Sequence, residues 1–188
     1  GISTFNPSSD FLHFKVDSYD NNSLSGNSIY GIYKDDDNLL WIGTSEQGIN
    51  IINEKEIKYL NTENSNLLSN TILDITGYKN KVFIATSHGL SILVKDNENY
   101  TITNYTEKDG LPSNVITDIF VDSKGNYYIG CFLDGGLIKF NPNTKEYKIY
   151  KNIENDENSI SNNSVTFINE DLDGNILVGT IYGLNVLD

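Results

Sequence analysis

The residues best suited to hold a metal ion in this sequence stand in a short acidic segment. "DLDGN" at 171–175 offers carboxylate and amide oxygens, which are ligands that Ca²⁺ prefers. An EF-hand would need a longer loop and a distal glutamate, and neither follows. Comparable acidic segments recur as "DSKGN" at 122–126 and "DDD" at 35–37. Such segments are typical of hairpin turns, so we expect no metal and no cofactor at these positions.

Residues for nucleophilic or zinc-dependent catalysis are scarce. His13 and His88 are the only histidines and Cys131 is the only cysteine, so zinc-ligand spacing and an intrachain disulfide are both excluded. Cys131 takes the place of a threonine that recurs elsewhere in the chain, and we expect it to be a small buried residue and not a reactive thiol. No Ser–His–Asp set can be assigned from the order of residues alone. We therefore predict no catalytic residue.

The elements that would position any site are marked by a motif that occurs four times. It reads "LSGNSIYGI" at 24–32, "LLSNTILDI" at 67–75, "LPSNVITDI" at 111–119 and "ISNNSVTFI" at 160–168. Its asparagines, separated by 43, 44 and 49 residues, are Asn27, Asn70, Asn114 and Asn163. Asparagine tolerates turn conformations and hydrogen-bonds to nearby backbone. We interpret these residues as groups that fix the start of a strand, in preference to ligands that line a channel.

Each unit of the repeat predicts four short strands, A to D. In the third unit these are "NVITDIFVD", "NYYIGC", "GLIKFNP" and "EYKIYK". Strands A and B are nearly continuous apolar runs, as expected for strands that are covered on both faces. A four-stranded unit that recurs every 40–50 residues, roughly, is typical of a β-propeller blade, which buries its faces against neighbouring blades.

The predicted fold is all-β: a β-propeller segment of about four four-stranded antiparallel blades, in one domain over residues 1–188. Strands C and D of a preceding blade are expected at 1–16, complete blades at 24–62, 67–106 and 111–151, and strands A, B and C of a last blade at 160–188. This order favours an arc of a larger ring over a closed four-bladed ring. Its open ends would expose apolar faces and strand edges, so our hypothesis is that the isolated piece dimerises or pairs end to end.

The repeat resembles the two-component-regulator propeller family. "NLLWIGTSEQGI" at 38–49 and "GLPSNVITDIFVDSKGNYYIG" at 110–130 carry the likeness most closely, and the four units span nearly the whole chain. Trp41 of the first unit is replaced by Phe83, Tyr128 and Leu177 in the others. The resemblance implies an extracytoplasmic sensor propeller of a membrane-anchored hybrid histidine kinase or related regulator. It also implies a carbohydrate ligand, because several characterised members of the family sense carbohydrates.

The charge of the chain limits its partners. Thirteen basic and 26 acidic residues give a formal net charge of −13. An acidic surface repels nucleic-acid phosphates and anionic lipids, so we expect no nucleic acid and no membrane contact by this segment. The sequence has no methionine, even at position 1, and no signal-peptide pattern. We expect a piece of a longer chain, whose missing blades and signalling domains would be its partners.

Loops that differ between the units are the candidates for a binding site. In a propeller the B–C and D–A loops lie on one face, and here they vary more than the A–B turns. We expect ligand binding through six residues of the B–C loops: Glu46, Gln47, His88, Phe132, Asp134 and Tyr182. Aromatic, polar and acidic side chains together would suit a sugar. Ordinary solvated loops are the alternative interpretation.

Three functions are compatible with these observations. The first is a ligand-sensing segment of a bacterial two-component-type receptor that recognises an extracellular carbohydrate. The second is a structural or protein-interaction propeller without a small-molecule ligand. The third is a propeller enzyme acting on glycans, which would need converging acid/base or metal residues that do not recur in this sequence. The choice of the first rests partly on analogy of fold.

Overall fold

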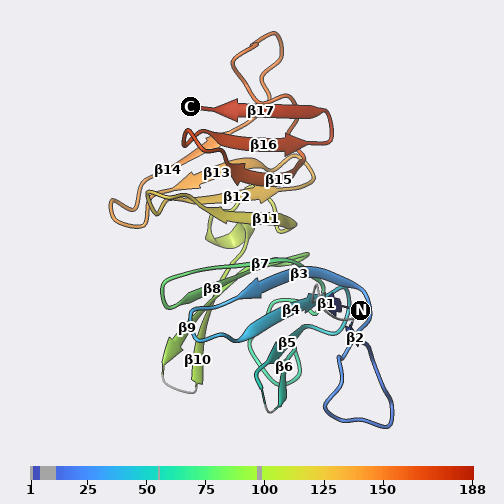
Figure 1. The fold of residues 1–188 in the computed structure, drawn as a ribbon. Helices are drawn as coiled ribbons and strands as arrows, with labels where there is room; N and C mark the ends of the chain where they lie inside the picture. The colour runs from blue at the N-terminus through green and yellow to red at the C-terminus, as the bar shows by residue number, and fades with distance from the viewer. Residues whose placement is uncertain (1, 5–11, 55, 97–98) are drawn as a thin grey trace.

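The strands of this protein form five antiparallel sheets in the order of the chain (Figure 1). The structure, a computed structural model, describes residues 2–4, 12–54, 56–96 and 99–188. Blade 1 contains β3 (Ile29–Lys34), β4 (Leu40–Thr44), β5 (Ile49–Ile52) and β6 (Ile57–Leu60). Blade 2 contains β7 (Ile72–Tyr78), β8 (Lys81–Thr86), β9 (Gly89–Asp96) and β10 (Asn99–Tyr105). Each sheet is thus built from strands that are consecutive in sequence.

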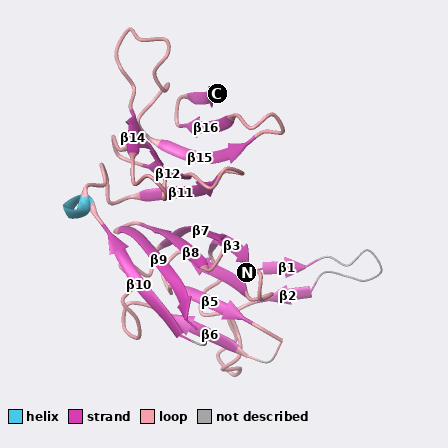
Figure 2. Ribbon diagram, turned by 90° about the vertical axis from the view of Figure 1, so that its left-hand side faces the viewer, coloured by secondary structure: helices cyan, strands magenta, loops and turns pink. Residues whose placement is uncertain are grey.

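The remaining strands continue the same pattern. Blade 3 contains β11 (Ile116–Val121), β12 (Tyr127–Cys131), β13 (Gly136–Phe140) and β14 (Tyr147–Tyr150). Blade 4 has three strands, β15 (Val165–Glu170), β16 (Ile176–Thr180) and β17 (Gly183–Leu187). A separate pair is formed by β1 (Ile2–Thr4) and β2 (Leu12–Phe14), while residues 1 and 5–11 of the predicted first strand pair lie outside the described residues. Figure 2 shows a short helical turn, η1 (Glu107–Asp109), between β10 and β11. The predicted all-β propeller fold is confirmed.

The first strand of every blade carries a β-bulge at the same place. The register with the second strand shifts between Ile29 and Gly31, and at the equivalent positions of β7, β11 and β15. A bulge bends its strand and increases the local twist. Because the bulge recurs, the first strands of the blades share one shape. These strands also contact one another in order: β3 contacts β7, β7 contacts β11 and β11 contacts β15.

The hydrophobic core lies between the blades. Three clusters of buried residues correspond to the three junctions, and each draws side chains from two successive blades. At the junction of blades 3 and 4, a Cβ atom added to Gly130 would lie 2.8 Å from Cγ1 of Val165. The glycine therefore allows the next blade to approach closely, as is typical of a glycine inside a strand.

The two terminal blades each leave one apolar face uncovered. Ile32 of blade 1 is 53% exposed, whereas the equivalent Ile75 of blade 2 is 3% exposed against blade 1. Leu184 of blade 4 is 67% exposed, whereas the equivalent Leu137 of blade 3 is 1% exposed. Figure 1 shows blades 1 and 4 at opposite ends of the molecule. The blades therefore form an open arc, as predicted.

Candidate functional site

The B–C and D–A loops lie together along one edge of the blades. In every blade, a backbone N–H of the B–C loop donates to a carbonyl oxygen at the end of the D–A loop. The four bonds join Ser45 to Ser28, Ser87 to Thr71, Phe132 to Val115 and Ile181 to Ser164. The B–C loop and the D–A loop of each blade thus lie side by side, and we call the surface that they form the loop face.

The repeated asparagines hold this face in shape. Oδ1 of each accepts a hydrogen bond from the backbone N–H two residues beyond the last strand of the preceding sheet. The donors are Val16 for Asn27, Thr62 for Asn70, Glu107 for Asn114 and Asn152 for Asn163, at 2.6–3.0 Å. The interpretation of these residues as structural groups is confirmed, because their amide oxygens are used within the D–A connection.

Glu46 and Gln47 share a depression on the loop face. The depression has a volume of about 310 Å³ and is formed with residues 25–28, Thr44 and Ser45. The backbone N–H of Gln47 donates to Oγ1 of Thr44 at 2.9 Å, which orders the loop. Both predicted side chains are exposed at the surface of this depression. Its lining is rich in hydroxyl, amide and carboxylate groups, which can hydrogen-bond to a polyhydroxylated ligand.

Phe132 and Asp134 lie on the loop face of blade 3. Oδ1 of Asp134 accepts from Nδ2 of Asn163 at 2.5 Å, and the carbonyl oxygen of Asp134 accepts from Nζ of Lys151 at 2.7 Å. The loop of blade 3 is thereby tied to the D–A loop that leads into blade 4. Phe132 is half-buried and Asp134 is exposed.

His88 and Tyr182 stand on the loop faces of blades 2 and 4. Nδ1 of the exposed His88 lies 2.9 Å from Oγ of Ser87, which in turn lies 3.1 Å from Oγ of Ser69. Tyr182 is 77% exposed at the tip of the β16–β17 hairpin. The structure therefore brings Glu46 and Gln47 into one depression and Phe132 and Asp134 into one loop, while His88 and Tyr182 belong to separate blades. The binding role of these six residues stays a prediction.

The acidic turns on the opposite edge are hairpins, as predicted. Oδ1 of Asp171 accepts the backbone N–H groups of Asp173 and Asn175, and Oδ2 accepts Nδ2 of Asn175. These hydrogen bonds, with that from the Asn175 side chain foremost, lower the pKa of Asp171. Asp35 and Asp122 accept equivalent backbone bonds in their turns. No group of three or more metal-binding side chains occurs among the described residues.

Two carboxyl groups meet on the inner strands of blades 2 and 3, a feature that the sequence did not indicate. Asp74 accepts the backbone N–H of Ile119 at 3.2 Å, and Asp118 accepts that of Ile168 at 2.5 Å, so each carboxyl group bonds to the following blade. Burial, and then the charge of Asp74, raise the pKa of Asp118 to about 7. Repulsion from the carboxylate of Asp74 therefore favours the protonated form of Asp118.

Cys131 is fully buried at the junction of blades 2 and 3. Burial raises the pKa of its thiol to about 12. The thiol is therefore protonated at neutral pH and cannot act as a nucleophile. The prediction of a small buried residue is confirmed.

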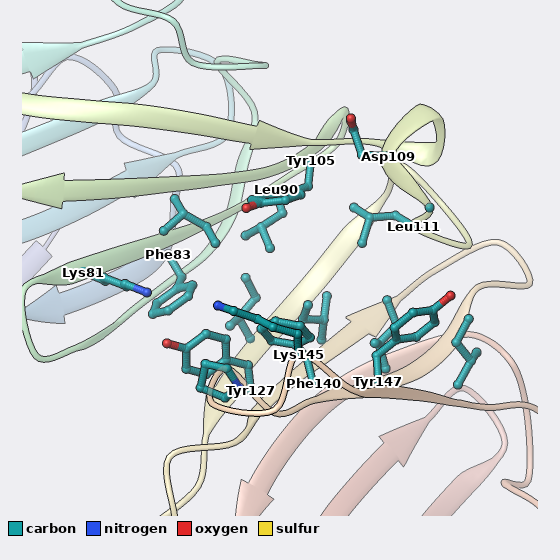
Figure 3. A pocket seen from close by; sticks show the side chains of 17 residues that line it. Lys81, Phe83, Leu90, Tyr105, Asp109, Leu111, Tyr127, Phe140, Lys145 and Tyr147 are labelled. Carbon is teal, nitrogen blue, oxygen red and sulfur yellow. The ribbon is translucent and has the colours of Figure 1, made fainter.

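A cavity between blades 2 and 3 was also missed by reasoning from the sequence (Figure 3). It has a volume of about 280 Å³, and most of its lining is aliphatic or aromatic. One signal was present in the sequence: Phe83 of blade 2 stands where blade 1 has the larger Trp41. A smaller side chain at a junction leaves volume unfilled unless the neighbouring blade compensates.

Comparison with known proteins agrees with this architecture. Residues 23–46 and 110–132 match the family described as two component regulator propeller. No curated protein matches the chain. The structure is similar to the extracellular domain of the hybrid two component system BT3049 from B. thetaiotaomicron, with 23% identity and a TM-score of 0.66 over 97% of this chain and 30% of that one. The match therefore covers about a third of that domain.

Two further solved structures share the fold. The extracellular domain of the hybrid two component system BT4673 from B. thetaiotaomicron is 22% identical, with a TM-score of 0.69 over 95% of this chain and 26% of that one. Virginiamycin B lyase from Staphylococcus aureus is 16% identical, with a TM-score of 0.58 over 85% of this chain and 55% of that one. These likenesses establish the fold, and the chain spans less than a third of the two extracellular domains.

Proposed function

We propose that this chain, which carries repeats of the two-component-regulator propeller family, is a ligand-sensing segment of a bacterial two-component-type receptor and that its ligand is an extracellular carbohydrate. The observation that carries the proposal is the match of segments of blades 1 and 3 to this family. Two propellers of similar fold, which are extracellular domains of hybrid two component systems, support it. The rest of the propeller and the signalling domains would belong to the parent chain. The segment would act outside the cytoplasm as part of a membrane-anchored receptor.

The loop face supports binding in preference to a purely structural role. Its scaffold is regular, because the same asparagine bond recurs in every blade, while the side chains that it presents differ from blade to blade. A rigid scaffold with variable loops is a common basis for recognition. The depression beside Glu46 and Gln47 offers hydrogen-bonding groups, and Phe132 and Tyr182 offer rings on which a sugar can stack.

Extracytoplasmic action is consistent with two neighbours of similar fold, which are extracellular domains. No helix in the described ranges is long and apolar enough to cross a membrane.

The proposal is tested by isothermal titration of the intact sensor propeller with oligosaccharides released from different polysaccharides. We expect one oligosaccharide class to bind and to be recovered uncleaved. Glu46→Ala and Tyr182→Ala should weaken that binding, whereas Glu54→Ala, an exposed glutamate of the C–D turn, should not. Absence of binding by every class would favour a structural or protein-interaction propeller. Cleavage of a bound oligosaccharide would favour an enzyme.

A further inference from the structure

The cavity between blades 2 and 3, which we call the inter-blade cavity, has a lining whose chemistry is unlike that of the loop face. One wall comes from blade 2 and includes Phe83 and Ile92, and the facing wall comes from blade 3 and includes Tyr127 and Phe140. Tyr147, 66% exposed, stands at its edge. Small-molecule sites in proteins enclose about 300–1,000 Å³ and are mostly apolar, so a volume of about 280 Å³ suits a small ligand.

The aromatic residues at this junction differ from those at the junction of blades 1 and 2. At the junction of blades 1 and 2, Trp41 is fully buried and its ring lies edge-on to Tyr100, with centroids 5.2 Å apart. At the next junction Phe83 occupies the same repeat position and contacts Tyr127, with centroids 4.8 Å apart. Phenylalanine lacks the second ring of tryptophan. The cavity thus lies at the junction where a phenylalanine, and not a tryptophan, faces the next blade.

The charges around the inter-blade cavity favour an anion. Lys81 and Lys145 both line it, and Figure 3 shows their side chains directed toward the side of the cavity where Phe83 lies. Neither ammonium group forms an ion pair within the described part of the chain. The acidic residue of the lining, Asp109, accepts hydrogen bonds from the backbone N–H and Oγ1 of Thr106 and is thereby engaged in capping the turn η1. Nζ of Lys81 lies over the ring of Tyr127, 5.9 Å from its centroid. Two cations without an ion pair among the described residues thus stand at one cavity in a chain of net charge −13.

We propose that the inter-blade cavity binds a small apolar molecule that carries one anionic group, with its apolar body between the aromatic walls and its anion beside Lys81 and Lys145. Burial of the apolar body supplies most of the driving force, and the lysines select the charge. A free sugar fits poorly, because its hydroxyl groups would face walls that offer few hydrogen-bonding partners. The proposal is independent of the ligand bound on the loop face.

The test uses 8-anilino-1-naphthalenesulfonate and its neutral analogue N-phenyl-1-naphthylamine, two fluorescent probes that differ by the sulfonate. We expect saturable binding of the anionic probe to this chain and weaker binding of the neutral one. Phe83→Trp should fill the cavity and reduce the affinity for both probes by about tenfold or more. Lys145→Gln, at an exposed turn, should weaken the anionic probe by about fivefold and leave the neutral probe unchanged.

Binding at the open ends of the arc must be distinguished from binding in the cavity. Leu184→Asp alters the uncovered face of blade 4 and should leave saturable binding intact. The proposal is overturned if Leu184→Asp abolishes binding while Phe83→Trp does not, or if the anionic probe shows no saturable binding. If Phe83→Trp fails to fold by circular dichroism, the lysine variants decide: equal responses of the two probes to Lys81→Gln and Lys145→Gln would refute the charge selection.

Discussion

Replacement of Asp118 by asparagine should make the chain more stable at alkaline pH, which is opposite to the usual effect of changing a half-buried residue. The carboxyl group of Asp118 lies beside Asp74 and accepts the backbone N–H of Ile168. An asparagine can keep that acceptor with Oδ1 and donate to Asp74 with Nδ2. It therefore reproduces the protonated form of the acid and removes the form in which two negative charges repel.

The size of the effect follows from the pKa of Asp118, which is about 7 in the folded chain against an ordinary value of 3.8. Between these values the folded state holds a proton that the unfolded state has released, so stability falls as pH rises and levels off above the folded pKa. Each unit of pH in this window costs about 1.36 kcal/mol, and the wild-type chain should lose about 3 kcal/mol between pH 5 and pH 8.

The assay is urea unfolding followed by the fluorescence of Trp41, the only tryptophan and fully buried. We expect the free energy of unfolding of Asp118→Asn to match the wild type near pH 5 and to exceed it near pH 8. Glu157→Gln removes one exposed charge and should keep the wild-type slope. A wild-type stability that is flat or rises between pH 5 and pH 8, or an equal slope in Asp118→Asn, would refute this account of the carboxyl pair.

Three further outcomes are expected. Gly130→Ala should destabilise the chain by about 1–3 kcal/mol in urea unfolding, because the added Cβ would meet Val165 at 2.8 Å. Gly179→Ala should be nearly neutral, because this glycine lies at the uncovered face and the nearest atom to an added Cβ is 3.5 Å away. Equal effects of the two substitutions would show that the neighbouring blade is not the cause. Asn114→Ala should cost about 1 kcal/mol in urea unfolding, because the backbone N–H of Glu107 loses its acceptor, and an unchanged stability would contradict the structural role of this asparagine. The isolated chain should self-associate through its uncovered faces, and Leu184→Asp should lower the mass seen by light scattering at high concentration; a monomeric wild type would contradict this.

The uncovered faces have a shared physical origin in the repeat. Ile32 faces away from blade 2 and Leu184 faces away from blade 3, and both occupy positions that neighbouring blades cover elsewhere in the arc. Each end of the arc therefore resembles a junction between blades that lacks one of its two blades. Another blade or a second copy of the chain can cover such a face. The same repetition that builds the core is therefore the reason to expect self-association.

Local sequence was sufficient for the fold because each blade is held by bonds between residues close in the chain. Asn114 bonds to the backbone of Glu107 and Asp171 bonds within its own five-residue turn, so a single repeat already contains both partners. Strand order, the hairpin turns and the structural role of the asparagines could be predicted for that reason. The edge on which the B–C and D–A loops gather follows from the same strand order.

Only the tertiary structure decided what lies between the blades. Asp74 and Asp118 stand 44 positions apart and meet because successive inner strands lie side by side. Gly130 and Gly179 occupy the same place in their strands, yet the first is closed in by Val165 and the second is not. The cavity beside Phe83 depends in the same way on the residues that blade 3 places opposite. Packing between blades is set by pairs of residues from different repeats, so no single repeat determines it.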